Sequence, residues 1–528
     1  MANFMQNILD TDATALYTMG GNKRRRLSQE ELDNMMATCG NADFEITSEH
    51  RQLVRHIFTD HANVFLTGGA GTGKTSFIIN VLIPAMSNRG YNFAMTATTG
   101  IAGSHFGGKT IHSWAGIGLG PYFNPMENYA QSMTPEEQKA KYEDTYRLWR
   151  TNKRMYDNVR EGVKKRIRAV EVLLIDEISM CPGAGLLNYL DFFFKIVRDS
   201  EEPFGGIQMI FVGDFAQIPP VEKAKKGFDD PTHADWAFLS QSWSEANIIP
   251  VQLTKVFRQK DVEFANFLND VRVGNPTSKE YRKRFEKKVP EEELKNYTFL
   301  VPTNKQADEF NKFFLEQYPK PTMQADARIL TTPETLKSWE TLEKVRTQLL
   351  AGKLIKYTLS LRVGLPVLLT VNDRNGLYVN GTIAFIESFH KGETDDDDYI
   401  VLRLNKVDGP KHHLFRYAYT RNQLEDPTDL IMVADKETGK MKEVCPHPIL
   451  KQFPLIPASA QTCHKAQGQS LDRGILSIGN AFLPGQVYGA LSRLRTAEGL
   501  VLDDSDFQVM VDQDVMKYYQ TITVCKDE

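Results

Sequence analysis

Gly68–Thr75 reads GGAGTGKT, which is the pattern G-x-x-x-x-G-K-T. A short apolar run precedes it at Asn63–Thr67 (NVFLT) and predicts a buried parallel strand. A longer apolar run follows it at Ser76–Ile83 (SFIINVLI) and predicts one helix. A glycine loop between a strand and a helix aims backbone N–H groups, and the positive end of the helix, at phosphate oxygens. The stretch therefore predicts a nucleotide-binding loop made of Gly68, Gly69, Ala70, Gly71, Thr72, Gly73, Lys74 and Thr75.

The same pattern occurs a second time at Gly103–Thr110 (GSHFGGKT). Here the following residues, Ile111–Gly118, are too rich in glycine to form the helix that phosphate binding needs. We therefore interpret the second copy as a chance match in a loop and expect one nucleotide site.

Length and composition limit the class of protein. At 528 residues the chain exceeds one ordinary core, and two to four domains are expected. An apolar content of 41% and a charged content of 25% are typical of soluble globular proteins, and no apolar run approaches the ~18 residues of a membrane helix. The five cysteines are scattered, which argues against a disulfide framework or a zinc site and fits a reducing compartment, the cytoplasm or the nucleus. Because the net charge is −4, any contact with nucleic acid has to come from a local groove.

The first residues carry little information about function. Asp10 and Asp12 stand in a stretch of twenty residues without a basic side chain, so neither a secretory signal nor a transit peptide is expected. Lys23–Arg26 (KRRR) follows and fits a nuclear address, an arm that touches phosphates, or a solvated tail.

The chemistry of the loop requires partners elsewhere in the chain. Lys74 would reach the β- and γ-phosphates, and the Thr75 hydroxyl would hold Mg²⁺. Val172–Ile175 predicts a buried strand that ends in Asp176 and Glu177. Asp176 would complete the Mg²⁺ shell, and Glu177 would polarise the attacking water. A GTPase would need the element N-K-x-D, and the nearest string, at 304–307 (NKQA), lacks the acid. The pattern therefore favours ATP hydrolysis.

Further residues are expected to respond to the γ-phosphate. Ile207–Val212 predicts a third strand, and Gln217 lies in the segment after it, where Phe215 offers an apolar ring. Charge spreads over oxygens as a phosphoryl group is transferred, so arginines from a facing lobe are expected, and the candidates are Arg258 and Arg493.

The order of these strings resembles superfamily 1 DNA helicases of the Pif/Dda branch. The strings at Thr96–Ala102 and Thr110–Ser113 look like that family's motif Ia region, which gives the second loop a place outside the nucleotide site. The segment from Asp176 to Gln208 resembles the signature of the branch, and Pro454–Asp472 looks like motif V. The resemblance covers roughly residues 48 to 519.

The sequence also departs from the family pattern. Residues 120–168 form a longer and more charged segment than in many relatives. The glutamine that reads adenine is expected shortly before the loop, where Gln52 is the nearest one. Cys463 replaces an isoleucine or valine, and Thr98–Thr99 replaces a proline–threonine pair.

The resemblance implies an α/β fold with two RecA-like parallel-sheet lobes, an inserted wedge element and an SH3-like β insertion. The expected division is a polar N-terminal extension (1–45), lobe 1 (46–247, with the wedge at 120–168), lobe 2 (248–358 and 452–528) and the insertion (359–451). Within the insertion we expect strands at Pro366–Val371 and Thr382–Ile386, joined across a turn at Asn380–Gly381. Its acidic run Asp395–Asp398 is expected to be a solvated hairpin tip.

The resemblance also implies ligands and roles. ATP and Mg²⁺ would be the cofactors, with Gly468 of motif V added to the nucleotide-binding residues. Single-stranded DNA would cross both lobes through phosphate contacts and stacking; the candidate residues are Thr98, Gly100, His112, Phe215, His464 and Lys465. Forked duplex DNA is a further expected ligand, and replication or repair proteins are candidate partners of a chain that works as a monomer away from membranes.

Three functions remain to be compared. The first is an ATP-dependent helicase that translocates 5′-to-3′, a polarity taken from the family. The second is a DNA-stimulated ATPase that acts as a switch or loader and does not unwind duplex. The third, a binding scaffold without catalysis, is disfavoured because Lys74, Thr75, Asp176, Glu177, Arg258 and Arg493 are all present.

Overall fold

The computed structural model divides the chain into two compact units. The first combines Met1–Lys287 with Ala466–Glu528, and the second is Lys288–Lys465. The structure describes residues 27–39, 45–104, 106, 108–117, 159–220, 234–257, 261–318, 322–330, 343, 346–347, 350, 355–371, 373, 377–378, 380–394, 397–405, 407–419, 431–434, 441–444 and 448–522.

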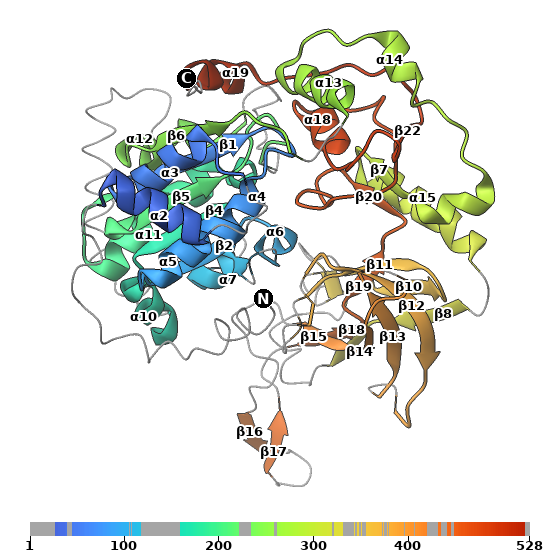
Figure 1. Cartoon of the computed structure of the whole chain (residues 1–528). Helices are drawn as coiled ribbons and strands as arrows, with labels where there is room; N and C mark the ends of the chain where they lie inside the picture. The colour runs from blue at the N-terminus through green and yellow to red at the C-terminus, as the bar shows by residue number, and fades with distance from the viewer. Residues whose placement is uncertain are drawn as a thin grey trace, which may run out of the picture. The chain divides into compact units, whose positions relative to one another are not determined.

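The first unit is built on a parallel sheet, drawn in Figure 1 in blue to green. In spatial order its strands are β3 (Lys109–Thr110), β2 (Phe93–Ala97), β4 (Val172–Asp176), β5 (Gln208–Val212), β1 (Val64–Gly68) and β6 (Ile249–Leu253). Strands β1, β4 and β5 are buried along their whole length, which is why their sequences are continuous apolar runs. The α/β architecture and these three strands were predicted, and both predictions are confirmed.

Helices cover both faces of this sheet. Alternate residues of β1 point to opposite faces: Phe65 joins one apolar cluster, and Val64 and Leu66 join another. The α-helices whose buried side chains join the Phe65 cluster are α7 (Ile111–Ala115), α10 (Glu161–Ala169), α11 (Asn188–Arg198), α12 (Gln241–Glu245) and, through Val515, α19 (Gln513–Gln520). Those that join the second cluster are α2 (Gln29–Cys39), α3 (Ser48–Phe58), α4 (Lys74–Phe77), the π-helical turn η1 (Ile78–Leu82) and α5 (Ile83–Asn88). The sheet therefore sits between two apolar layers.

The remaining elements of the first unit lie around this core. They are α6 (Gly100–Ser104), η2 (Ile178–Met180), η3 (Gly183–Leu187), η4 (Pro203–Gly206), η5 (Ala237–Leu239), α13 (Val262–Val273), α14 (Lys279–Lys283), β21 (Gly474–Leu476), α18 (Gln486–Leu491) and β22 (Leu500–Leu502). Strands β21 and β22 pair in parallel.

The second unit contains a parallel strand pair and antiparallel sheets. Its elements are η6 (Glu291–Asn296), β7 (Thr298–Val301), α15 (Asn304–Gln317), β8 (Thr322–Asp326), β9 (Arg328–Leu330), β10 (Thr358–Arg362), β11 (Pro366–Leu369), β12 (Ile383–His390), β13 (Tyr399–Leu404), β14 (Lys411–Phe415), β15 (Tyr417–Tyr419), β16 (Ile431–Ala434), β17 (Met441–Val444), β18 (Ile449–Gln452), β19 (Leu455–Pro457) and β20 (Ala460–Thr462). β20 pairs with β7 in parallel, whereas β14, β13, β12, β11 and β19 form an antiparallel sheet in that order.

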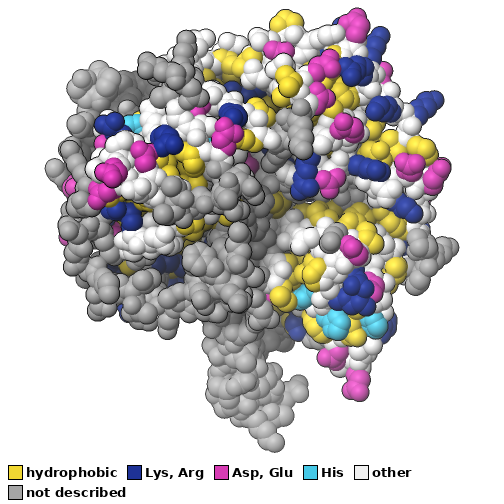
Figure 2. All heavy atoms as spheres, viewed as in Figure 1, with side chains coloured by type: hydrophobic (Ala, Val, Ile, Leu, Met, Phe, Trp, Pro, Cys, Tyr) yellow, Lys and Arg dark blue, Asp and Glu magenta, His cyan; other side chains and the backbone are white. Residues whose placement is uncertain are grey.

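One face of the β12–β14 part of that sheet is rich in rings. The His390 ring stacks on Tyr399 with centroids 4.7 Å apart, and Tyr399 contacts His413 and Phe415. Figure 2 shows histidine side chains gathered over this part of the unit. The opposite face of the same strands carries the apolar core, which includes Ile400 and Leu402.

The strands expected in the SH3-like insertion are confirmed. The turn between them is also present, since Gly381 has a φ of 95° and its N–H donates to the Leu369 carbonyl at 2.7 Å. Asp397 lies exposed in the loop between β12 and β13, as expected for a solvated hairpin tip. Asp398 differs from that prediction, because it is 5% exposed and accepts the Gly392 N–H at 3.2 Å. Residues 395–396 lie outside the described residues. Within the described ranges, no helix combines the length and apolar character that a membrane crossing needs.

The structure differs from the expected division in two respects. Because β6 pairs with β1, the first sheet continues to Leu253, past the boundary expected at Asn247. Residues 466–528, expected in the second lobe, belong to the first compact unit. The other boundaries stay predictions, and most of the expected wedge, its residues 120–158, lies outside the described residues.

Candidate nucleotide-binding site

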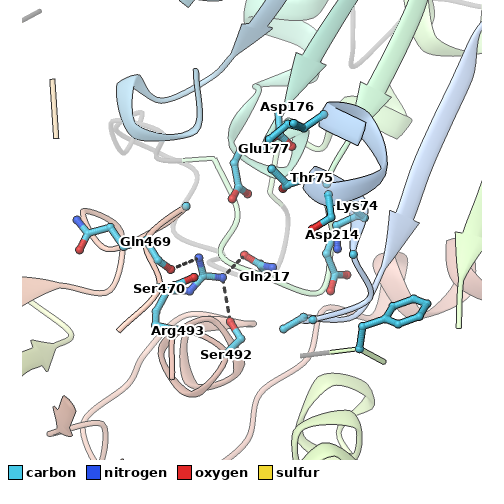
Figure 3. A pocket seen from close by; sticks show the side chains of 18 residues that line it. Lys74, Thr75, Asp176, Glu177, Asp214, Gln217, Gln469, Ser470, Ser492 and Arg493 are labelled. Atoms are coloured by element: carbon cyan, nitrogen blue, oxygen red, sulfur yellow. Dashed lines mark hydrogen bonds between the residues drawn. The ribbon is translucent and has the colours of Figure 1, made fainter. Parts of the chain in front are cut away.

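A cavity of about 550 Å³ opens at the carboxyl ends of β1, β4 and β5, within the first unit (Figure 3). This volume is within the usual range for small-molecule sites. Its lining residues are Ala70, Gly71, Gly73, Lys74, Thr75, Ser76, Ile79, Asp176, Glu177, Gly213, Asp214, Gln217, Phe257, Gly468, Gln469, Ser470, Ser492 and Arg493. The cavity therefore collects the glycine loop, the ends of two other strands and two segments from the C-terminal part of the chain.

The glycine loop is shaped by backbone constraints. Gly68 has a φ of 145°, and a Cβ there would lie 2.6 Å from the Leu253 carbonyl oxygen. Gly73 has a φ of 83° and caps the start of α4, so the helix begins directly beneath the loop. The Lys74 ammonium folds back and donates to the carbonyls of Gly68 at 2.7 Å and Gly69 at 3.1 Å. Burial lowers the pKa of Lys74, and the negative charge of Asp214 is the largest effect that opposes it.

Two acidic residues follow β4 directly. Glu177 has a φ of 54°, and its N–H donates to Asp176 Oδ1 at 2.8 Å. Burial and the neighbouring Glu177 raise the pKa of Asp176 to about 7. A divalent cation beside Asp176 would stabilise the ionised carboxylate and offset the free-energy cost of burying its charge. The Thr75 hydroxyl and a carboxylate are ligands that Mg²⁺ accepts together with phosphates and water, so these residues fit that ion.

Gln217 and Arg493 meet at the other end of the cavity (Figure 3). Arg493 Nη2 donates to Gln217 Oε1 at 3.0 Å and to Ser492 Oγ at 2.9 Å, while Nε donates to the Gly489 carbonyl at 3.0 Å. Both side chains are 6% exposed. The structure thus brings together predicted residues from separate parts of the chain, among them Lys74, Thr75, Asp176, Glu177, Gln217 and Arg493.

Sequence reasoning missed a buried network around Asp214. Its carboxylate is fully buried and accepts two hydrogen bonds from the Arg272 guanidinium, at 2.9 and 3.0 Å, and one from each of Tyr488 and Tyr519. Burial acts to raise the pKa of Asp214, but Arg272 and these donors hold it below the usual value. Asp214 and Tyr488 stand inside strings that the sequence pointed to, whereas no local signal marks Arg272 or Tyr519.

A second missed residue is Phe257, which lines the cavity beside the loop. Its N–H donates to the Gly71 carbonyl at 2.8 Å, and its ring lies against Gly73. At 39% exposed it offers an aromatic face to a ligand.

Of the other predicted nucleotide residues, some line the cavity and some do not. Arg258 lies outside the described residues. Gln52 lies on α3 and is not among the described residues that line the cavity. Gly468 lines the cavity with a φ of 78°. Thr72, 2% exposed, closes the loop by donating to the Gly69 carbonyl at 2.9 Å.

Of the four DNA-binding candidates in the first unit, Thr98, Gly100 and His112 stay predictions, and Phe215 is corrected. Thr98 is tied to the acidic pair, because its hydroxyl donates to the Glu177 carbonyl at 2.8 Å. Gly100 begins α6, and His112 lies on α7, where burial lowers its pKa to about 4. Phe215 is a correction: its ring is 1% exposed among Phe65, Trp236, Phe238, Trp243 and Tyr518, so it serves the core and cannot stack on a base.

His464 and Lys465 belong to the second unit and follow β20. Burial lowers the pKa of both side chains, and Asp308 opposes this effect at Lys465. Their contact with DNA stays a prediction.

Comparison with known proteins gives consistent matches. The family model described as PIF1-like helicase matches residues 45–145 and 151–282. The ATP-dependent DNA helicase Pif1 of Bdellovibrio bacteriovorus is 31% identical over 462 residues, which cover 87% of this chain and 88% of that protein. The ATP-dependent DNA helicase PIF1 of Emericella nidulans is 30% identical over 511 residues, and there the match covers 90% of this chain but 63% of the relative.

A solved structure shows the same architecture. The crystal structure of the Pif1 helicase from Bacteroides in complex with ADP-AlF3 and ssDNA is 27% identical to this chain and superposes with a TM-score of 0.67. The match covers 90% of this chain and 97% of that one.

Proposed function

Because the chain belongs to the PIF1-like helicase family, we propose that it is an ATP-driven DNA helicase that moves 5′-to-3′ along single-stranded DNA and separates duplex strands. Family membership confirms the resemblance that the motifs indicated. The observation that carries the activity is the cavity in which Lys74, Asp176, Glu177, Gln217 and Arg493 converge.

The geometry supports a division of roles in ATP hydrolysis. The Lys74 ammonium, now held by loop carbonyls, would move to the β- and γ-phosphates, whose oxygens are stronger acceptors. Thr75 and Asp176 would hold Mg²⁺, which would neutralise charge on the phosphates. Glu177 would accept the proton of the attacking water. The Arg493 guanidinium would stabilise charge that develops on the transferred group, at a position set by Gln217.

DNA is proposed as the second ligand. The Pif1 helicase from Bacteroides was crystallised with ssDNA. A further solved Pif1 structure, 26% identical to this chain, describes DNA unwinding at forked dsDNA. Thr98, Gly100, His112, His464 and Lys465 are the proposed contacts. Thr98 is the best supported of these contacts, because the bond from its hydroxyl to the Glu177 carbonyl would link a bound DNA strand directly to the hydrolytic residues. The chain is proposed to act on DNA as a monomer. Its proposed location is the cytoplasm of a bacterium or of a phage-infected cell, or a nucleus.

Strand separation on forks of both polarities tests this function. A duplex with a 5′ single-stranded tail should be unwound with Mg·ATP, and a matched 3′-tailed duplex should not. Lys74→Ala serves as the control that removes ATP use. ATP turnover stimulated by DNA without strand separation would favour a switch or loader, and unwinding from the 3′ tail would reverse the proposed polarity.

A further inference from the structure

Two tyrosines near the C-terminus connect the Asp214 carboxylate to different parts of the nucleotide site. Tyr488 lies on α18 and donates to Oδ2 at 3.1 Å. Tyr519 lies on α19 and donates to Oδ1 at 2.8 Å. Because burial raises the pKa of both phenols, each remains a neutral hydroxyl that can donate to a carboxylate.

Tyr519 joins the end of β1 to the segment after β5. Its oxygen accepts the Phe215 N–H at 2.8 Å and contacts the Thr67 hydroxyl at 3.0 Å. The Phe215 segment continues to Gln217, whose own N–H donates to the Asp214 carbonyl at 3.0 Å. Tyr519 therefore helps to set the position of the glutamine that receives Arg493.

Tyr488 acts on the glycine loop instead. Its oxygen accepts the Ala70 N–H at 2.8 Å, and it lies 3.7 Å from the position that a Cβ on Gly69 would occupy. The bond fixes the direction of one loop amide. Without the phenol oxygen, this partly buried N–H would have to find another acceptor, and the loop would have to shift.

Helix α19 is firmly held against the rest of the unit. Asp512 caps its first turn and accepts the Trp236 indole N–H at 2.9 Å, and Val515 is fully buried in the core. The Arg272 guanidinium also lies over the Tyr519 ring, 4.7 Å from its centroid. Tyr519 is thus presented to Asp214 by a docked helix.

We propose that Tyr519 and Tyr488 are positioning residues that divide control of the ATP site: Tyr519 sets the catalytic Gln217–Arg493 end, and Tyr488 sets the nucleotide-binding loop. The proposal deepens the ATPase part of the proposed function. It assigns a role in catalysis to the last helix of the described chain, although that helix carries no residue that touches the nucleotide cavity.

Phenylalanine variants test the division, because each removes one hydroxyl and keeps the ring. For Tyr519→Phe we expect kcat for DNA-stimulated ATP hydrolysis to fall about tenfold, with KM for ATP changed less than about twofold. For Tyr488→Phe we expect KM, and the Kd of a fluorescent ATP analogue, to rise about tenfold, with a smaller effect on kcat. Both values are to be measured on the full chain with saturating single-stranded DNA.

Tyr518→Phe is the matched control on the same helix. The Tyr518 ring stacks on Phe238, with centroids 4.4 Å apart, and its hydroxyl interacts with Trp243 rather than with Asp214. This variant should keep the parental kcat and KM. Thr67→Val is the second variant, because it removes the hydroxyl that contacts Tyr519 without changing the helix; it should lower kcat in the same direction as Tyr519→Phe.

Several results would overturn the division. Parental kcat in Tyr519→Phe and in Thr67→Val would remove Tyr519 from the catalytic end. If one of the two variants is unstable, parental kcat in the other has the same meaning. An equal loss in Tyr518→Phe would reduce the effect to general packing. If the parent chain hydrolyses ATP but does not unwind a fork, the helicase function is contradicted. The roles of Tyr519 and Tyr488 in ATP hydrolysis are then still decided by the kcat and KM of their variants.

Discussion

The Arg493 guanidinium donates a hydrogen bond to the Gln217 side-chain oxygen at 3.0 Å, although 276 positions separate the two residues in the chain. The pair closes one end of the cavity, opposite Thr75 and Asp176 (Figure 3). The contact places a cation beside a neutral amide, which leaves the charge of the guanidinium available to a phosphate.

Lys74→Ala should abolish ATP hydrolysis and leave single-stranded DNA binding within about twofold of the parent. Lys74 is held by loop carbonyls inside the cavity, and none of the DNA contacts proposed in the first unit (Thr98, Gly100 and His112) is among the residues that line it. ATPase assays and fluorescence anisotropy with a labelled oligonucleotide measure the two properties. A parallel loss of DNA affinity would show that the sites are not separate.

Glu177→Gln should bind Mg·ATP normally and turn it over about 10²–10⁴-fold more slowly, because the amide cannot accept the proton of the water. Asp176 and Thr75 would still hold the metal ion. Equilibrium binding of a nucleotide analogue and single-turnover kinetics separate the two steps. Hydrolysis at the parental rate would assign the base elsewhere.

Arg493→Ala should reduce kcat about 10²-fold or more, with a much smaller change in ATP affinity, because the guanidinium acts mainly on charge that develops in the transition state. Arg493→Lys should remain impaired, since a single ammonium nitrogen cannot stand both at the Nη2 position, which bonds Gln217 and Ser492, and at the Nε position, which bonds the Gly489 carbonyl. Arg258→Ala is expected to behave in the same way, although Arg258 lies outside the described residues. Two alanine variants with parental kcat would contradict the role of both arginines.

Because of His50, the folded protein should be less stable in mild acid than at neutral pH. The His50 side chain is 1% exposed and stacks on Phe77, and burial lowers its pKa from 6.5 to about 4. The unfolded chain therefore binds a proton between these values that the folded chain does not. The resulting stability is present above pH 6.5 and is lost as the pH falls towards 4, by up to ~3 kcal/mol.

Urea unfolding across this pH range measures the effect of His50. The slope between pH 6.5 and 4 should be shallower in His50→Gln than in the parent. His56→Gln is the control on the same helix, where the histidine pairs with Asp60 at 2.8 Å near the surface. An identical slope in the parent and in His50→Gln would assign the acid sensitivity to other groups.

Shortening the segment 120–168 should slow unwinding much more than DNA-stimulated ATP hydrolysis. Its sequence mixes Trp149 and Tyr146 with basic residues such as Arg147 and Arg150, a composition suited to bases and phosphates. A deletion that leaves α10 from Glu161 onwards intact preserves the packing of Ile167 in the core. Unwinding at the parental rate would show that the segment does not separate strands.

Local patterns in the sequence were sufficient to predict the nucleotide loop and the acidic pair. A strand buried on both faces must be continuously apolar, so the run Val172–Ile175 marked Asp176 and Glu177 as the residues that leave its carboxyl end. The glycines of the loop were recognisable for a related reason, because L side chains rarely adopt the φ of Gly68 and Gly73. The order of these motifs then identified the family.

The tertiary structure alone decided which residues surround Asp214 and where Phe215 points. A buried carboxylate has to be satisfied by whatever donors lie nearest, and those came from Arg272, Tyr488 and Tyr519 on three separate helices. No spacing in the sequence records that convergence. Beyond the end of β5, the Phe215 ring turns into the core, whereas the carboxylate of its neighbour Asp214 receives the network. This difference between adjacent residues depends on the packing of the Phe215 ring against Trp236, Trp243 and Tyr518.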